Sequence, residues 1–537
     1  MIRITNRKSE MSNPTAGSSA LAIPRSYINP LPASAHFDFI QRNAQGDLVE
    51  KGTSTPFRWL SFNIPALLLC EDRPQFQRGY PMCKNPDPNP VDWKDGYKLG
   101  TENGRRCIIS PYGENAWEWV VPDPWEQEDA VRSIAGLGGR VIRTYTLGFG
   151  DHYHMEGPGK FNEKAFVAMD HALALCRKYG VRLVIPLVNQ NSPNLYYGDY
   201  GIMTGFRKKS PSAFFTDPEL INDFKGLIKF MLNRKNTVNG IRYGDDCTIL
   251  AWQTGNELGG WEGAPPPSRW TIDIATYIKG LAPNTLVMDG TMGGLDFKKR
   301  IPIESLQSKY VDVFSNNYYY GRQDIQRLKD DPAHTRLYKK AFAVTEFGLA
   351  DEGTLTDVAT AISSNKLVSG GLLWSLRYHS VFSGFYTHFE KLNYWSYHIP
   401  GFPAAKGFMP EETNIVKMVR NLALPLAGRS TKEPYPCPPT PGAIRGVTPL
   451  TLKWKGSTWA ARYSVARCKC STPTPPPETV WETLSWSVKD NVEWGKTIYS
   501  DKTAVKGVLY CYKIQAISVD GFVCGKDALI IGPIKNS

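Results

Sequence analysis

The sequence predicts an α/β protein, a (β/α)8 TIM barrel followed by a small all-β domain. Eight apolar, β-rich runs alternate with helical patterns over about 370 residues, which fits the eight strand and helix repeats of such a barrel. Several runs are continuous Val, Ile and Leu, as is typical of strands buried on both faces of a parallel sheet. Beyond a proline-rich segment, short runs alternate polar with apolar residues, which indicates antiparallel strands.

Start signals for helices lie between the predicted strands. Asp123, Pro124 and Glu126 supply a cap, an N1 proline and a capping-box acid, and Thr216 precedes Pro218 in the same way. The predicted strands are FRWLSFNIPALL from Phe57, RVIRTYTL from Arg140, VRLVIPLV from Val181, TILAWQTGNE from Thr248, TLVMDG from Thr285, VDVFSNNYY from Val311, KAFAVTEFG from Lys340 and GGLLWSLRY from Gly370.

Composition divides the chain into four parts. They are an N-terminal extension (1–36), the barrel (37–426), a Pro-rich linker (427–442) and a β-sandwich domain (443–537). The last part resembles a fibronectin type III sandwich. We expect it to be a packing partner for the barrel rather than a sugar-binding module, because a fold alone does not specify binding.

The longest insertion follows the first strand, from Cys70 to about Trp125. Loops after the strands form the active-site face of a barrel, so this segment is expected to build one wall of a cleft. Cys70, Cys83 and Cys107 lie within it or at its edge. We expect free thiols there, with a disulfide as the alternative, because the sequence carries no signal of an oxidising compartment.

Composition also restricts the partners and the location. The formal net charge of +12 is dispersed, and no nucleic-acid motif accompanies it, so no nucleic-acid partner is predicted. No run approaches the roughly 20 apolar residues of a membrane span. The absence of a CxxC pair predicts no zinc site, and neither a metal nor a cofactor is expected. The N-terminus lacks an apolar h-region, which predicts a cytoplasmic protein, or a secreted one if a leader was removed.

Two predicted barrel strands finish near a glutamate, Glu257 and Glu346. A carboxylate in either place is costly to bury without a purpose, although a single one would fit an ion-paired core residue. Together they meet at one rim of the barrel, where an acid beside a nucleophile can cleave a glycosidic bond. Carboxyl groups about 5 Å apart would retain the anomeric configuration.

Longer motifs carry a resemblance to a known family. The chain resembles glycoside hydrolase family 5, and SAFFTDPELINDFKGLIKFMLNRKNTVNGIRYGDDCTILAWQTGNEL from Ser212 is similar to the endo-1,4-β-mannanases of that family. PGKFNEKAFVAMDHALALCRKYGVRLVIPLVNQ from Pro158 resembles them too. The resemblance covers roughly Phe37 to Leu426, and its specificity rests on the combined NRKNT, DD and AWQTGNE run.

The resemblance implies roles for individual residues. Glu257 would be the general acid/base and Glu346 the nucleophile. Asn256 would bond the sugar 2-hydroxyl, whose contact strengthens in the transition state. Arg143 would keep the nucleophile charged, with a strand-end salt bridge as the alternative. Tyr319 would donate its hydroxyl to Glu346.

Two tryptophans are candidate sugar platforms, since apolar sugar faces stack on aromatic rings. Trp374 would form the platform at the cleavage point, with a core role as the alternative. Trp261, just past the acid/base glutamate, is a candidate for an additional subsite, with loop packing as the alternative.

The chain departs from the family pattern at several positions. Asn317, a candidate substrate-binding residue, stands where the family usually has a histidine. The acid/base is flanked by Gly255 and Leu258, where alanine and proline are commoner. The eighth strand carries Arg377, which could close one end of the cleft, and His379, which we interpret as structural. These differences leave the glutamate pair intact.

The sequence therefore predicts a retaining hydrolase of β-1,4-mannosidic bonds, acting on a β-linked polysaccharide or oligosaccharide. Two alternatives stay open: a related family 5 β-glycosidase, exo-acting or specific for another β-glycan, and a non-catalytic carbohydrate-binding barrel. Discrimination at C2 depends on loop geometry, so the sequence does not choose between the first two. It also leaves the oligomeric state open.

Overall fold

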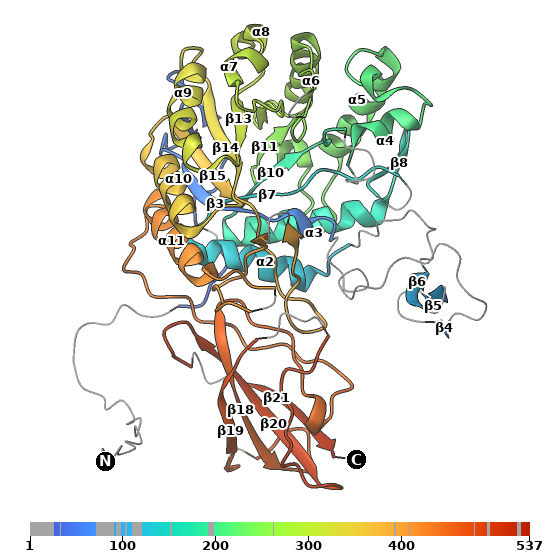
Figure 1. Cartoon of the computed structure of the whole chain (residues 1–537), viewed down its shortest axis with the longest axis vertical. Coiled ribbons are helices and arrows are strands. Elements are labelled where there is room, and N and C mark those ends of the chain that lie inside the picture. The colour runs from blue at the N-terminus through green and yellow to red at the C-terminus, as the bar shows by residue number, and fades with distance from the viewer. Residues whose placement is uncertain are drawn as a thin grey trace, which may run out of the picture.

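The computed structural model joins a closed barrel of parallel strands to a separate antiparallel sheet (Figure 1). It describes residues 26–32, 34–70, 91–92, 98–102, 105–109, 121–150, 153–191, 198–260, 263–390, 394–405, 407–476, 478–490, 495–523 and 528–536.

The barrel contains all eight predicted strands, which confirms the fold class. Around the barrel the strands follow the order β10-β11-β12-β13-β14-β15-β3-β7, each parallel to its neighbours. The strands are β3 (Trp59–Asn63), β7 (Val141–Arg143), β10 (Arg182–Pro186), β11 (Ile249–Gln253), β12 (Leu286–Met288), β13 (Val313–Tyr318), β14 (Ala341–Phe347) and β15 (Val368–Leu373).

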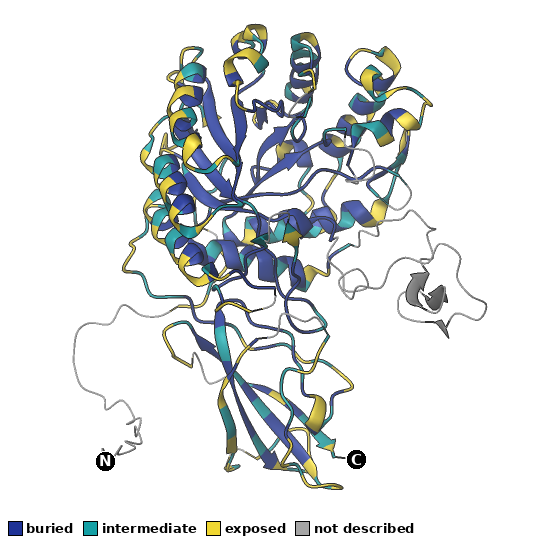
Figure 2. Ribbon diagram, viewed as in Figure 1, coloured by how far each residue is buried: buried dark blue, intermediate teal, exposed yellow. Residues whose placement is uncertain are grey.

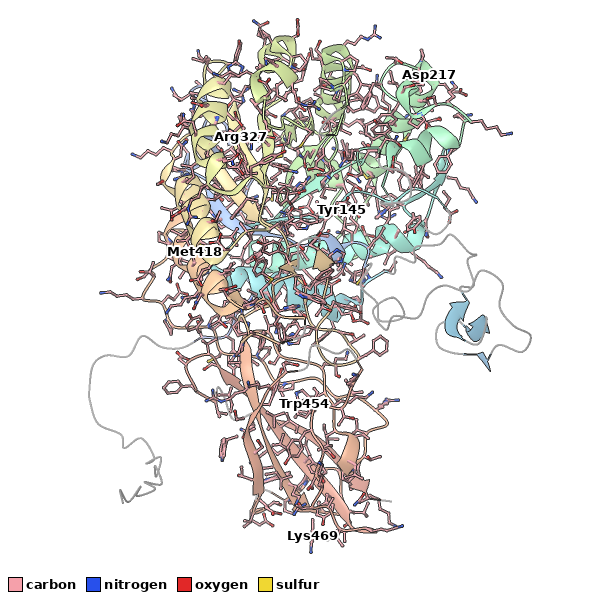
Figure 3. All side chains as sticks on the ribbon, viewed as in Figure 1. Tyr145, Asp217, Arg327, Met418, Trp454 and Lys469 are labelled. Atoms are coloured by element: carbon pink, nitrogen blue, oxygen red, sulfur yellow. The ribbon has the colours of Figure 1, made fainter. Side chains whose placement is uncertain are left out.

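Helices surround the barrel and turn their buried sides towards it (Figure 2). The first begins with the predicted capping box, in which Asp123 accepts from the Trp125 amide and Glu126 bonds back to Asp123. At the start of α5 the prediction was wrong, because Asp217 and not Thr216 caps the helix (Figure 3). The helices are α2 (Pro124–Leu137), α3 (Glu163–Tyr179), α4 (Tyr200–Gly205), α5 (Pro218–Asn233), α6 (Ser268–Leu281), α7 (Phe297–Arg300), α8 (Ile303–Gln307), α9 (Asp324–Arg336), α10 (Glu352–Ser364) and α11 (Glu412–Leu426).

Two apolar clusters stabilise the barrel. The larger one fills the space between the strands and the helices, and the smaller one lies inside the barrel. The hairpin of β1 (Ile40–Arg42) and β2 (Leu48–Glu50) adds Ile40 and Leu48 to the inner cluster. It packs there against residues at the start of the strands, such as Trp59, so it closes the end opposite the carboxyl ends of the strands.

The C-terminal part contains a four-stranded antiparallel sheet, which confirms the all-β prediction. The strand order is β19-β18-β20-β21, from β18 (Ala460–Lys469), β19 (Glu482–Val488), β20 (Leu509–Ser518) and β21 (Leu529–Lys535). The predicted strand at TLKWKGS contributes only isolated bridges, Leu452 with Tyr499 and Lys455 with Gly442. Trp454 fills the core of this domain (Figure 3).

The two parts are packed together. Trp459, from the segment before β18, is buried in the large barrel cluster. Its indole lies against α2 so closely that a Cβ on Gly136 would approach the ring nitrogen to 2.3 Å. The predicted domain limits stay predictions, but the sheet is a packing neighbour of the barrel (Figure 1).

Shorter elements complete the described chain. The insertion after β3 contains a three-stranded sheet, and most of its predicted cleft wall, including Cys83 and the side chain of Cys107, lies outside the described residues. The remaining strands are β4 (Val91–Asp92), β5 (Lys98–Glu102), β6 (Arg105–Ile109), β8 (Met155–Gly157), β9 (Lys160–Phe161), β16 (Phe389–Glu390) and β17 (Tyr394–Trp395). The 3-10 helices are η1 (Pro65–Leu67), η2 (Pro211–Ala213), η3 (Tyr243–Asp245), η4 (Gly321–Gln323) and η6 (Pro449–Thr451).

Two further findings concern membrane spans and disulfides. Within the described ranges, no helix is long and apolar enough to cross a membrane. Cys437 is disulfide-bonded, which the sequence did not predict.

Candidate active site

The two predicted catalytic glutamates lie at the carboxyl ends of their strands. Glu346 belongs to β14 and is buried, with 5% of its surface exposed. Glu257 follows the end of β11 at Gln253 and is half-buried. Its backbone has φ of +50°, a left-handed conformation that is strained for a glutamate and that turns the chain at the rim.

A fixed cationic group holds the nucleophile candidate. Arg143, at the end of β7, donates from Nη1 to Oε1 of Glu346 at 2.7 Å. Its other donors reach Gln253 at 2.8 Å, Asn256 at 2.6 Å and Asn63 at 3.2 Å. With 1% exposure and four acceptors from the ends of three strands, β3, β11 and β14, the guanidinium has one orientation, which fixes the carboxylate in turn.

A second donor reaches Glu346 from the neighbouring strand. The Tyr319 hydroxyl donates to Oε2 at 2.7 Å, so each carboxylate oxygen has one strong partner. The predicted contact between these two residues is therefore present, while its catalytic role stays a prediction. Both donors favour the charged form of the carboxyl.

Within the described residues, the donors to the acid/base candidate are neutral amides. Gln190 Nε2 donates to Oε2 of Glu257 at 2.8 Å, and Asn317 Nδ2 donates to Oε1 at 2.8 Å. Thr345 donates to the Asn317 oxygen at 2.7 Å, which orients the amide. The structure thus places Asn317 on the acid/base candidate Glu257, so the position where the family usually has a histidine contacts one of the two candidate catalytic glutamates.

The two carboxyls differ in electrostatic environment. Burial, together with the charge of nearby Glu346, raises the pKa of Glu257 to about 7. Burial also raises the pKa of Glu346, but Arg143 and Tyr319 oppose that shift. Glu257 therefore keeps its proton below about pH 7, and the direct bond from Arg143 to Glu346 favours ionisation of Glu346 before Glu257, which suits an acid beside a nucleophile.

Asn256 links Arg143, the partner of Glu346, to Asn189, which follows the neighbouring strand β10. Its Oδ1 accepts from Arg143, and its Nδ2 donates to Asn189 at 2.9 Å. Asn189 in turn donates to the Tyr145 hydroxyl at 3.0 Å. These two contacts use one N–H group and one lone pair of the amide, and the bond from Asn256 to a sugar hydroxyl stays a prediction.

Of the two tryptophans predicted as sugar platforms, the structure describes Trp374 but not Trp261. Trp374 follows β15 and donates from its indole to Oε1 of Glu390 at 2.6 Å, while its ring meets Tyr145 edge-on at 6.1 Å. Those contacts fix the orientation of the ring, and its role as a sugar platform stays a prediction. Trp261 lies outside the described residues, so its role stays a prediction.

Sequence reasoning missed several residues of the site. Asn63, Asn189, Gln190 and Gln253 all stand at strand ends, so the argument that found the glutamates would have found these polar residues as well. Glu390 carries no such signal, because it lies in the short β16–β17 hairpin. Its carboxylate also lies 3.4 Å from His388.

The departures from the family pattern have structural reasons. A Cβ on Gly255 would lie 2.6 Å from the Leu258 side chain, so this leucine occupies the space that an alanine at 255 needs. Arg377 is buried and donates to Ser375 Oγ at 3.0 Å. That contact gives no support to the prediction that Arg377 closes the cleft. His379 is fully buried, in agreement with a structural role.

Comparisons with known proteins give consistent matches. A family model described as GH family 5 beta-mannosidase-like matches residues 150–315. Mannan endo-1,4-beta-mannosidase 5 of Arabidopsis thaliana is 28% identical over 316 residues, which are 49% of this chain and 72% of that protein. A solved glycoside hydrolase family 5 mannosidase from Rhizomucor miehei has a TM-score of 0.52 at 17% identity and covers 73% of this chain and 99% of that one. A variant of it, in complex with mannosyl-fructose, has a TM-score of 0.50 at 18% identity, with the same coverage.

These matches confirm the predicted resemblance to glycoside hydrolase family 5 and support a mannanase-like glycoside hydrolase. At their low identity, the solved structures show the fold alone. The family model includes Glu257 and ends before Glu346, so the roles of individual site residues stay predictions.

Proposed function

We propose that this chain is a retaining glycoside hydrolase that cleaves β-1,4-mannosidic bonds in mannan or manno-oligosaccharides. The observation that carries the proposal is the unequal glutamate pair at one rim of the barrel. Glu346 is bonded to a buried guanidinium, whereas Glu257 accepts from the amides of Gln190 and Asn317 and has a pKa raised to about 7. That difference suits a nucleophile beside an acid.

In the first step, a Glu346 oxygen attacks the anomeric carbon while Glu257 transfers its proton to the glycosidic oxygen. A bond from C1 to the carboxylate forms, the bond from C1 to the leaving oxygen breaks, and the shortened glycan leaves as an alcohol. Arg143 and Tyr319 keep the attacking carboxylate oriented and charged until it reacts.

In the second step, Glu257 is a carboxylate and removes a proton from water. The resulting hydroxide adds to C1, the bond to Glu346 breaks, and the sugar is released with its original anomeric configuration. Glu346 is an uncharged ester in the intermediate, and loss of its charge lowers the pKa of Glu257, which favours the ionised base that the second step requires.

The relatives suggest the substrate. The plant relative is named for endo action on mannan, which favours the first candidate. An exo-acting β-mannosidase is the second candidate, because the matching family model is described as beta-mannosidase-like. Both use the same two-step chemistry and differ in how many subsites lie on each side of the cleavage point.

A substrate panel tests the proposal. Linear mannan, glucomannan, cellulose and aryl β-mannosides and β-glucosides are incubated with the full chain, and the products are sized by chromatography. Mixed oligosaccharides from mannan support endo action, and mannose alone supports exo action. Cleavage of cellulose or β-glucosides in preference to every mannoside would reject the mannan assignment.

A further inference from the structure

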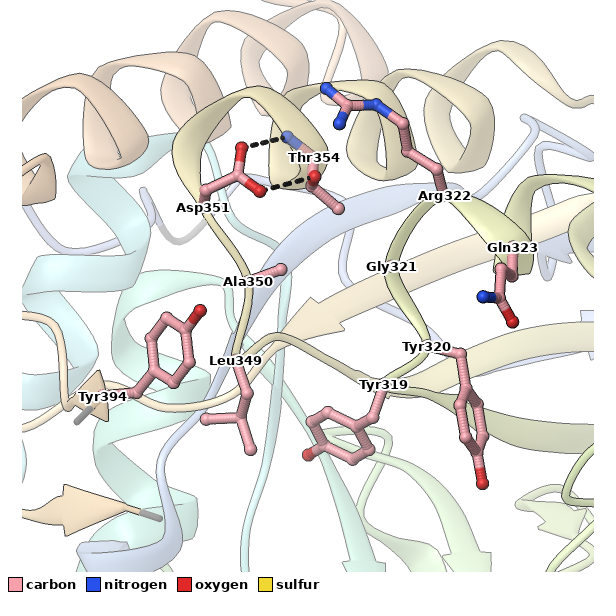
Figure 4. A pocket seen from close by; sticks show the side chains of 10 residues that line it. All are labelled: Tyr319, Tyr320, Gly321, Arg322, Gln323, Leu349, Ala350, Asp351, Thr354 and Tyr394. Carbon is pink, nitrogen blue, oxygen red and sulfur yellow. Dashed lines mark hydrogen bonds between the residues drawn. The ribbon is translucent and has the colours of Figure 1, made fainter. Parts of the chain in front are cut away.

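A pocket of about 400 Å³ lies between the loops that follow β13 and β14 (Figure 4). Tyr319 lines this pocket and donates to Glu346, so the pocket belongs to the candidate active site. A separate group of reactive side chains lies at the far end of the C-terminal sheet. β18 begins next to Trp459, which is buried in the barrel cluster, and it ends ten residues later at Lys469, roughly 30 Å away (Figure 3).

Three cysteine thiols meet at this end of the sheet. Cys468 on β18 lies directly opposite Cys511 on β20 in the antiparallel ladder, and Cys470 follows the end of β18. The sulfurs of Cys470 and Cys511 contact the same carbonyl oxygen, that of Thr472, at 3.2 and 3.3 Å. All three cysteines are free, and the thiol of Cys470 forms hydrogen bonds with both of the others.

The three thiols differ in exposure and in acidity. Cys470 is half-buried, whereas Cys468 is 7% exposed and Cys511 is fully buried. The Thr472 side chain, whose hydroxyl lies 3.3 Å from the Cys470 sulfur, is the main cause that lowers the pKa of Cys470. Burial raises the pKa of Cys468 and raises the pKa of Cys511 to about 12. Because the thiolate is the nucleophilic form, Cys470 is the reactive member of the cluster.

Two other roles fit the cluster less well. Buried cysteines often serve as small apolar side chains, but Cys470 is partly accessible and its sulfur contacts polar atoms of Thr472. Within the described ranges, no three His, Cys, Asp or Glu side chains are arranged to hold a metal ion. Thiols that contact one another can still react by disulfide exchange.

We infer that the cluster is a modification site for small disulfides, in which Cys470 reacts first and Cys511 resolves the product. In the first step, the Cys470 thiolate attacks one sulfur of the small disulfide. A bond from that sulfur to Cys470 forms, the S–S bond of the reagent breaks, and a small thiolate leaves and takes up a proton.

In the second step, Cys511 loses its proton to water and attacks the Cys470 sulfur. The bond from Cys470 to the reagent breaks, and the second small thiolate leaves and takes up a proton. Two protein thiols are thereby oxidised to one disulfide, and the small disulfide is reduced to two thiols. Cys511 is assigned as the resolving thiol because it shares the Thr472 carbonyl with Cys470.

The test uses the native full-length chain and oxidised glutathione at pH 8. Samples are quenched with acid over time, the remaining thiols are alkylated, and the peptides are mapped without reduction by mass spectrometry. The wild type should form a glutathione adduct on Cys470 first and a disulfide between Cys470 and Cys511 afterwards. In Cys511→Ala the adduct should persist. In Cys470→Ser the two buried thiols should react at least roughly tenfold more slowly than Cys470 does in the wild type.

Cys247→Ser is the matched control and should follow the wild-type time course. Cys247 has the same 7% exposure as Cys468, but its thiol contacts Arg177 and the Phe37 carbonyl. A Cys470 that stays unmodified, a first link between Cys468 and Cys511, or a Cys470→Ser chain that reacts at the wild-type rate would each overturn the inference.

A measurement on the wild type alone covers the case in which a variant does not fold. Iodoacetamide should label Cys470 at least roughly tenfold faster than the other two thiols of the cluster, because only Cys470 combines access with a lowered pKa. Equal labelling rates would overturn the assigned order of reaction. Both tests are independent of the glycosidase proposal, since neither measures turnover of a sugar.

Discussion

The junction between the barrel and the C-terminal sheet contains a buried histidine, and its replacement by glutamine is the most informative perturbation. His379 lies between two carboxylates, with Nδ1 2.9 Å from Asp129 of α2 and Nε2 3.1 Å from Asp490 of the C-terminal domain. Thr458 also donates to Asp129, and Tyr463 donates to Asp490 at 2.6 Å. The histidine is fully buried.

The two carboxylates keep the imidazole protonated, against the effect of burial. They raise the pKa of His379 to about 10, compared with about 6.5 in an unfolded chain. Since the folded-state pKa is the higher one, the contribution to stability is fully present below pH about 6.5. It decreases above that pH and is lost as pH rises through about 10.

The expected cost is large because His379→Gln removes the charge that two buried carboxylates share. Breaking a buried ion pair by removing one partner costs about 3–5 kcal/mol. The difference in unfolding free energy between wild type and variant should have that size at pH 6 and shrink as pH approaches 10. His36→Gln is the control, because His36 is exposed and, within the described part of the chain, its ring bonds only to the Lys51 carbonyl.

Urea unfolding followed by tryptophan fluorescence at pH 6, 8 and 10.5 measures the difference. If two transitions occur, each is fitted separately, since a chain with two domains need not unfold in one step. A difference that is constant over this pH range, or below about 0.5 kcal/mol at pH 6, would refute a buried imidazolium at the junction.

Four further outcomes are expected. Glu257→Gln and Glu346→Gln should each lower kcat by at least roughly 10³ with an unchanged circular dichroism spectrum, and activity within tenfold of wild type would contradict the assignment. The wild-type kcat/KM should fall as pH rises above about 7, where Glu257 loses its proton. Asn317→Ala should move this basic limb of the pH profile to higher pH, because the Asn317 amide lowers the pKa of Glu257. A basic limb at the same pH in the variant would contradict this. A chain that ends at Leu426 should retain the catalytic pair but have a lower urea midpoint, since it lacks the C-terminal domain that packs on the barrel; an equal midpoint would show that the domain adds no stability. EDTA should leave activity unchanged, because hydrolysis through two carboxylates needs no metal, and recovery of lost activity by a divalent metal would contradict the mechanism.

The sequence could predict features that depend on local pattern. All eight barrel strands are apolar runs, and the catalytic candidates stand at strand ends, where the barrel topology brings distant residues together. The cap of α5 was misplaced by one residue, because Thr216 and Asp217 are both good caps and local geometry selects Asp217.

Long-range contacts could not be predicted in this way. His379 meets one carboxylate 250 residues earlier and another 111 residues later, and no periodicity links those positions. Glu390 reaches Trp374 through a two-residue strand that carries no recognisable motif. The expected cytoplasmic location also stays a prediction, and the disulfide at Cys437 is of a kind that persists mainly in oxidising compartments.

The loop from Trp374 to Glu390 links the C-terminal domain to the reaction centre. At one end it carries the indole that Glu390 fixes beside the catalytic pair. In its middle, His379 is bonded to Asp490, and the Val381 amide and the Tyr386 hydroxyl donate to Glu126 at the start of α2. The same loop therefore bears both Trp374, the predicted sugar platform, and the charged contact with the C-terminal domain. This arrangement favours a domain that supports the cleft by packing over one that binds sugar on its own surface.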